Sequence, residues 1–265
     1  EIVQQVRQEI LAIGDIAIPE LEQFWEDNSF EPNFRERVEE LIHEIQFNTV
    51  KNGLEKWSKN PKSLLEGCYW VNRFQYPDLE IGTLKDGIKE LAGLANPNGF
   101  WGYGPKTSIQ EMNDILYRKR GFRGNKRHFH APQNNFLSDV LSSKKGNPLL
   151  LSVLYILVAE ELNIPIVGVN LPNHFIAGYK AWVQEDEEVI LFYVNPFSKG
   201  STLSKQDLVV FLQEMKIPVK EEYMAECSNL DMVKRMIVNL IYSYSRIGHG
   251  EKVEELRELE ETLNK

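Results

Sequence analysis

Apolar side chains recur three and four positions apart through the first 95 residues, which is the spacing of one face of an α-helix. Gly14-Asp15 interrupts the first of these runs, and Asn60-Pro61 ends the third. The pattern predicts five amphipathic helices, over residues 2–13, 18–25, 35–57, 63–74 and 83–94. We therefore expect a helical N-terminal region over residues 1–95, with no clear internal repeat.

The most apolar stretch of the chain, residues 149–159, predicts a buried helix. Its side chains are apolar on every face, so other parts of the domain must cover it on several sides. Asn147 suits the N-cap and Pro148 suits the first helical position, while Asn163 and Pro165 are typical of a helix exit. With about 14 residues the helix is too short for a bilayer, which needs roughly 20.

The residues after this helix alternate between apolar and polar in a way that is typical of β-strands. Strands are predicted over residues 166–171, 175–183 and 189–194. Further helices are predicted over residues 108–119 and 134–141, before the buried helix, and over residues 206–215, 232–245 and 251–263, after it. We expect an α+β protein in which the buried helix packs on an antiparallel sheet. The expected division is a helical region at 1–95, a core at 96–225 and a helical hairpin at 226–265. Residues 96–106 are rich in Gly and Pro and predict a linker or a loop beside the core.

Candidate catalytic residues follow the buried helix in a recognisable order. His174 lies before the second strand and Asn195 lies at the end of the third. Papain-like and transglutaminase-like folds use Cys, His and Asp or Asn in this order, with the thiolate at the N-terminus of a helix. His174 is therefore a candidate general base, and Asn195 is a candidate for orienting its ring.

Several short motifs resemble the SirB-type branch of the transglutaminase-like superfamily, from roughly residue 64 to the C-terminus. The motifs are Gly121-Phe122-Arg123-Gly124-Asn125, Asn135-Phe136-Leu137-Ser138-Asp139-Val140-Leu141, Gly146-Asn147-Pro148, Gly168-Val169-Asn170-Leu171-Pro172-Asn173-His174-Phe175 and Asn195-Pro196-Phe197. The resemblance implies a papain-like core, a tetratricopeptide-like tail and a bacterial regulatory protein. One such helical unit cannot bury its own apolar face, so the tail must dock on the core or on a partner.

The position of the superfamily's nucleophile differs in this chain. Aligned on the helix exit at Ile164-Pro165, the resemblance brings the nucleophilic Cys of the superfamily to Pro148. A pyrrolidine ring cannot attack a carbonyl, so His174 and Asn195 would be two members of a triad that lacks its nucleophile. The resemblance thus implies a protein that is not an enzyme, although the residues alone leave that question open.

Residues 118–130 form the one basic cluster in a chain that is acidic as a whole. It contains four candidate binding residues, which are Arg123, Arg127, His128 and His130. The cluster could be a structural loop held by Arg–carboxylate pairs, a site for an anion or a phosphorylated partner, or a metal site. We predict no metal, because His128 and His130 would supply two ligands without an evident third.

Composition and charge restrict the classes of function. The net charge is −9, from 39 acidic and 30 basic residues, which argues against general nucleic-acid binding. Cys68 and Cys227 match no metal-ligand spacing and predict reduced thiols in a cytoplasmic protein. Neither a signal peptide nor a membrane segment is recognised in the sequence, and we expect no cofactor.

The sequence therefore favours a regulatory module that binds a protein or peptide in the cleft of an impaired core. Asn147, Pro148 and Asn173 are the candidate contacts beside His174. The alternative is a hydrolase or acyl transferase that uses His174 and Asn195 with a relocated Ser or Cys. Candidate hydroxyls for that alternative are Ser152, Ser142 and Ser143. A third class is a metal-dependent hydrolase that uses His174 with His128 and His130.

Overall fold

A computed structural model of the chain describes residues 2–27, 29–95, 104–184 and 187–264. The predicted linker or loop at 96–106 lies mostly outside these residues. The helices are α1 (Ile2–Ile13), α2 (Ile18–Glu26), α3 (Pro32–Ser58), α4 (Leu64–Arg73), α5 (Ile81–Ala92), α6 (Pro105–Asn113), α7 (Leu137–Ser143), α8 (Pro148–Glu161), α9 (Lys205–Glu214), α10 (Asn229–Arg246) and α11 (Gly250–Leu263). The strands are β1 (Arg123–Gly124), β2 (Lys145–Gly146), β3 (Ile166–Val169), β4 (Ile176–Gln184), β5 (Glu187–Asn195) and β6 (Ser201–Leu203).

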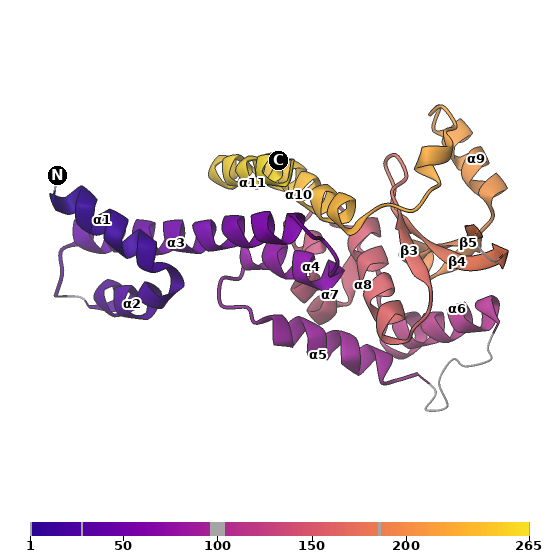
Figure 1. Ribbon diagram of the computed structural model, residues 1–265, viewed down its shortest axis with the longest axis horizontal. Helices are drawn as coiled ribbons and strands as arrows, with labels where there is room; N and C mark the ends of the chain where they lie inside the picture. The colour runs from indigo at the N-terminus through magenta and orange to yellow at the C-terminus, as the bar shows by residue number, and fades with distance from the viewer. Residues whose placement is uncertain (1, 28, 96–103, 185–186, 265) are drawn as a thin grey trace.

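The buried helix α8 lies between the sheet and the helices α5, α7 and α10 (Figure 1). Every residue from Pro148 to Ala159 is buried, as the uniform apolar pattern predicts. Asn147 is the N-cap, and Asn163 has a left-handed backbone with a φ of 55°. The sequence prediction for both ends of this helix is therefore confirmed.

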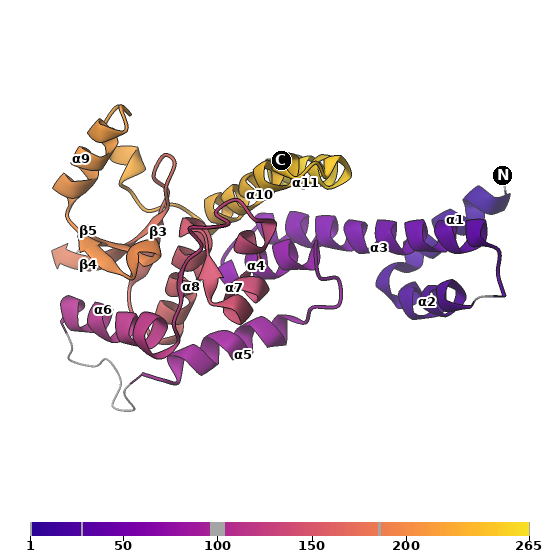
Figure 2. The same cartoon turned by 180° about the vertical axis from the view of Figure 1, so that it is seen from behind.

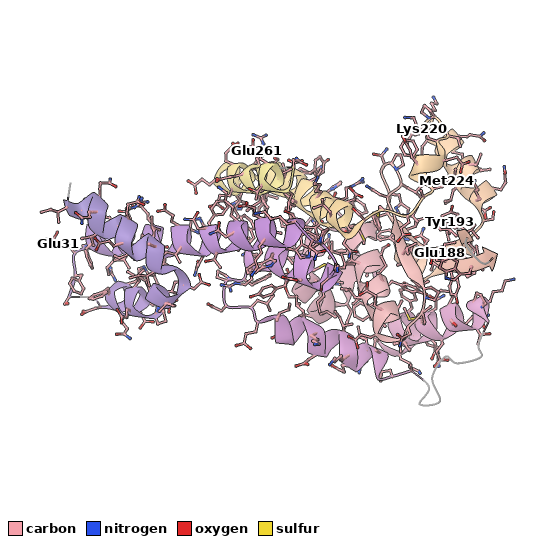
Figure 3. The ribbon with its side chains drawn as sticks, viewed as in Figure 1. Glu31, Glu188, Tyr193, Lys220, Met224 and Glu261 are labelled. Carbon is pink, nitrogen blue, oxygen red and sulfur yellow. The ribbon has the colours of Figure 1, made fainter. Side chains whose placement is uncertain are left out.

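The main sheet is antiparallel, with the strand order β3-β4-β5-β6. Because side chains alternate along a strand, its two faces carry different apolar clusters. Ala177, Tyr179 and Val194 join the main core around α8, whereas Ile176 and Tyr193 join a second cluster with residues of α9. The Tyr193 hydroxyl donates to the backbone carbonyl of Met224 at 2.9 Å, and Figure 3 labels both residues near α9. The α+β fold, with a helix packed on an antiparallel sheet, is therefore confirmed.

Helix α3 joins two parts of the molecule. Its second half contributes Val50, Leu54 and Trp57 to the main core. Its first half, with Leu41 and Ile45, packs against α1 and α2 in a separate, smaller cluster. Both views show α1, α2 and this half of α3 extending away from the rest of the chain (Figures 1 and 2). The N-terminal end is thus stabilised mainly by contacts among these three helices.

The C-terminal hairpin of α10 and α11 packs on the body of the protein. The two helices contact each other, α10 also contacts α4 and α8, and α11 contacts α3. Leu240 and Leu256 belong to the same buried cluster as α8. The hairpin therefore buries its apolar face against the main core. Its tetratricopeptide-like character and the division of the chain at residues 95 and 225 stay predictions.

Two helices differ in detail from the sequence prediction. The helix expected over 108–119 is α6 followed by a π-helical segment at Asp114–Lys119. The helix expected to begin near residue 134 is a 3₁₀ turn at Pro132–Asn135, followed by α7. In that turn the side chains of Asn134 and Asn135 form hydrogen bonds with His128 and Asn147. The spacing of apolar residues cannot predict such bonds between segments. Along the described ranges, no helix combines the length and the apolar character needed to cross a membrane.

Asn72 connects α4 to α7 in the buried core, and its removal is a test of this packing. The side chain is fully buried, and its Oδ1 accepts from the backbone N–H of Ser138 at 3.0 Å and from the Ser138 hydroxyl at 2.8 Å. We expect Asn72→Ala to lower the free energy of unfolding by about 1–3 kcal/mol, because two part-buried donors of Ser138 lose their acceptor. Urea unfolding measures the change.

The matched control is Asn52→Ala, at an exposed position of α3. It should change the free energy of unfolding by less than about 0.5 kcal/mol. Equal effects of the two substitutions would contradict the role assigned to Asn72.

Candidate functional site

A cavity of about 120 Å³ lies at the N-terminus of α8. Four segments enclose it: the loop before α7, the start of α8, the turn before β4, and one face of α10. Figure 2 shows α10 beside α8. The lining residues are Phe129, His130, Asn135, Asn147, Pro148, Leu149, Asn173, His174, Phe175, Arg235, Asn239, Tyr242 and Ser243. The structure therefore brings the predicted residues Asn147, Pro148, Asn173, His174 and His130 to one cleft.

Hydrogen bonds of Asn147 fix the helix end that faces the cavity. Its Oδ1 accepts from the backbone N–H of Leu150 at 2.8 Å, and its Nδ2 donates to Asn135 Oδ1 at 2.6 Å. Asn135 in turn donates to the Ser243 hydroxyl of α10 at 3.4 Å. Pro148 follows at the first helical position and is buried. Since proline has neither a nucleophilic atom nor a backbone N–H, this position can neither attack a carbonyl nor donate to an oxyanion.

His174 is held by a tight turn at the entrance to β4. Its backbone N–H donates to the carbonyl of Leu171 at 3.2 Å, and Asn173 before it has a left-handed backbone with a φ of 60°. The imidazole lies near two aromatic rings, with centroid distances of 6.4 Å to Phe197 and 6.0 Å to Phe211. The turn and the two rings together restrict the orientation of the imidazole.

The surroundings of His174 favour its neutral form. Burial lowers the pKa of the imidazole, and the positive charge of Arg235 lowers it further. A hydrogen bond with the Asn195 side chain acts in the opposite direction and raises the pKa. Asn195 Oδ1 also accepts from the backbone N–H of Ser198 at 3.2 Å, which ties it to the end of β5. This contact agrees with the predicted pairing of His174 with Asn195, whose catalytic roles stay predictions, and Asn195 does not line the cavity.

The hydroxyls and thiols singled out in the sequence do not line this cavity. The fully buried Ser152 hydroxyl donates to the carbonyl of Pro148 at 2.8 Å, as mid-helix serines commonly do. Cys68 is also fully buried, and its burial raises the pKa of the thiol. Burial also raises the pKa of the Cys227 thiol, to about 12. Neither thiol is therefore a reactive nucleophile at neutral pH.

The basic cluster has two parts with different contacts. Ion pairs hold the first part, where Arg118 pairs with Asp114 and Arg120 pairs with Glu90. Asparagine side chains hold the second part. The Asn125 Nδ2 donates to Asn134 Oδ1 at 2.9 Å, and Asn134 donates to the carbonyl of His128 at 2.6 Å.

The candidate residues of the cluster are dispersed in the structure. Arg123, Arg127 and His128 are exposed and do not line the cavity, whereas His130 does. No group of three metal-binding side chains occurs among the residues that the structure describes. The arrangement thus gives no support to a metal site that combines His174 with His128 and His130.

Four cavity residues on α10 were not identified from the sequence. Arg235, Asn239, Tyr242 and Ser243 occupy one face of this helix, at spacings of four, seven and eight residues from Arg235. The available sequence signal was weak: Arg235 and Asn239 are polar residues at partly buried positions of this helix. Only the contact between α10 and the start of α8 identifies those positions as parts of the cleft.

A titration of His174 tests the electrostatics of this site. We expect its pKa to lie below about 6.5, the value in unfolded chains, so that the ring is neutral at pH 7. Arg235→Gln should raise the pKa, because it removes a nearby positive charge, and Asn195→Ala should lower it. NMR of the imidazole carbons against pH measures all three values.

The same shift predicts the pH dependence of stability. Because the folded pKa lies below the unfolded one, the contribution of His174 is complete above about pH 6.5 and is lost as the pH falls through the folded pKa. Arg257→Gln, in an exposed ion pair of α11, is the control and should leave the His174 titration unchanged. An unaltered pKa in Arg235→Gln would contradict the assigned contact.

Comparison with known proteins agrees with this geometry. The sequence model described as the transglutaminase-like superfamily matches residues 83–238, which include β1 to β6, α8 and the first half of α10. No solved structure matches the chain.

Relatives occur in animals and bacteria. Human F-box only protein 21 is 22% identical over 252 residues, which cover 84% of this chain and 38% of that protein. A UPF0162 protein of Xylella fastidiosa is 27% identical over 149 residues, or 55% of this chain and 50% of that protein. Protein SirB1 of Salmonella typhimurium is 22% identical over 184 residues, which cover 68% of this chain and 66% of that protein. The bacterial origin implied by the resemblance stays a prediction. The superfamily match over more than half of the chain shows that the chain belongs to the transglutaminase-like superfamily, and its similarity to SirB1 and the UPF0162 proteins supports a place in the SirB-type family.

Proposed function

We propose that this protein is a non-catalytic member of its family and acts as a regulatory module that binds a peptide segment of a partner protein in the cleft. The observation that carries the proposal is Pro148 at the start of α8, beside His174. The position that the nucleophile would occupy has no reactive atom and no N–H donor. Both cysteines, Cys68 and Cys227, are free thiols, which favours a cytoplasmic protein.

Exposed aromatic side chains at the cleft support binding rather than chemistry. Phe129 is 39% exposed and Tyr242 is 49% exposed, and both line the cavity. The His130 ring contacts each of them, with centroid distances of 5.0 Å to Phe129 and 5.0 Å to Tyr242. Aromatic side chains of this kind are enriched where proteins bind one another. They would contact the peptide outside the cavity, while one small group enters it.

The size of the cavity limits what can enter. Its volume of about 120 Å³ corresponds to roughly four water molecules at their share of liquid volume. A side-chain end or a terminal group of a peptide fits this space, whereas a folded domain does not. The partner would therefore present an accessible segment.

A peptide library selected against the full chain tests the proposal. We expect bound peptides to perturb the NMR signals of Asn173 and His174. Asn239→Trp should weaken their binding by about tenfold or more, because it fills the cavity from α10. The matched control is Val238→Trp, since Val238 is 42% exposed on the same helix and does not line the cavity. Equal binding by the two variants would place the peptide elsewhere and reject the proposal.

A hydrolase or acyl transferase with a relocated nucleophile is the second candidate. It is favoured by Ser243, the one serine among the described residues that line the cavity with His174. Ser243 is 2% exposed, and its hydroxyl accepts from Asn135, which restrains it. Covalent labelling of Ser243 by a fluorophosphonate, lost in His174→Ala, would support this candidate and reject the non-catalytic one.

Restoring a thiol tests why the site would be inactive. Pro148→Cys introduces a nucleophile at the N-terminus of α8, where the helix dipole favours a thiolate. We expect iodoacetamide to alkylate this variant at neutral pH faster than the wild type, whose two thiols have raised pKa values. The double variant with His174→Ala should react more slowly, since the base is missing. Equal rates in the single and double variants would show that His174 does not serve this position.

A further inference from the structure

We infer that the cleft recognises a carboxylate, so that a bound peptide inserts its C-terminal carboxylate or an acidic side chain beside Arg235. This inference rests on the proposed peptide-binding function and names the group that enters the cavity. It follows from the charges around the cavity and from the hydrogen-bond donors that face it.

Arg235 carries a charge that the protein does not neutralise. Its guanidinium is half-buried in the wall of the cavity and donates to Asn170 Oδ1 at 3.0 Å. Within the part of the chain that the structure describes, no carboxylate forms an ion pair with it. Burial lowers the pKa of this guanidinium, without a compensating carboxylate. A partly buried charge of this kind is costly without an anionic partner, so the arrangement favours an anion supplied by a ligand.

The rest of the lining has the same electrostatic character. None of the described lining residues is Asp or Glu, although acidic residues exceed basic ones in the chain as a whole. His130 and His174 can donate from their rings, and Asn173 and Asn239 can donate from their amides. The N-terminus of α8 adds partial positive charge at the same place. Every described side chain that lines the cavity is therefore neutral or positively charged.

A carboxylate fits these donors better than a larger anion. The planar guanidinium of arginine presents parallel N–H groups that match the two oxygens of a carboxylate. The cavity has room for roughly four water molecules, which suits a carboxylate with its first carbon atoms. A peptide terminus also leaves its backbone outside, next to Phe129 and Tyr242.

Three probes test the inference on the full chain: N-acetyl-glycylglycine with a free carboxylate, its C-terminal amide, and inorganic phosphate. NMR signals of the His174 ring report binding up to millimolar dissociation constants. We expect the free acid to bind at least about tenfold more tightly than the amide. The acid should also raise the His174 pKa, because it offsets the field of Arg235.

Two substitutions identify the residues responsible. Arg235→Gln should weaken binding of the acid about tenfold or more and leave binding of the amide unchanged. Asn239→Asp preserves the size of the side chain and puts a carboxylate one helical turn from Arg235. This carboxylate should pair with Arg235 in place of the ligand, so binding of the acid should weaken and binding of the amide should stay unchanged. Arg257→Gln on α11 is the control for charge alone. If Arg235→Gln fails to fold, Asn239→Asp and the acid–amide comparison on the wild type still decide the result.

The outcomes separate this inference from the proposed function. Equal binding of acid and amide overturns carboxylate recognition while the peptide-binding function stands. Binding of phosphate without binding of the acid also overturns it, in favour of a free inorganic anion. If no probe perturbs His174, the inference is rejected, and the library selection with Asn239→Trp decides the proposed function independently.

Discussion

The side chain of Asn147 is the interaction on which the cleft depends. It accepts from the Leu150 N–H and donates to Asn135, so a single amide caps α8 and ties the helix end to the turn before α7. Because α8 is buried along its whole first three turns, it cannot shift along its axis without opening the core. Burial thus sets the position of the helix, and the cap sets the position of its end. Pro148 and His174 face the same cavity as a result.

The charges around this cavity differ from those of the molecule as a whole. The chain has a net charge of −9, yet the cleft contains Arg235 and two histidines. Arg235 and burial both keep His174 neutral, which opposes its use as the protonated partner of a thiolate. The same positive field would attract a carboxylate. The electrostatics therefore agree better with recognition of an anionic group than with the thiolate–imidazolium pair of a cysteine enzyme.

Pro148 shows that the fold accommodates a residue without a nucleophilic atom at the start of α8. Proline is well suited to the first helical position, where its missing N–H would have had no helical partner, so Pro148 does not weaken α8. The same ring offers neither a nucleophilic atom nor a backbone donor for an oxyanion. The architecture of the superfamily is thus compatible with a site that only binds, and function must be argued from the residues of the cleft. The α10 helix supplies much of that cleft, so the C-terminal hairpin is part of the site.

The sequence by itself determined most of the long helices, the three longer strands of the main sheet and the two ends of α8. The uniform apolar run at 149–159 required a buried helix, Asn147 and Asn163 marked its two ends, and alternation marked the strands that follow, because these signals are local. The order of the elements also predicted a pairing of His174 with Asn195. Only the tertiary structure decided the composition of the cleft. Arg235 and Asn239 resemble any polar residues of an amphipathic helix until α10 packs beside α8, and Arg123 and Arg127 lie outside the cleft although they are close to His130 in sequence. Contacts between distant segments depend on how whole helices pack, which no local pattern of residues records.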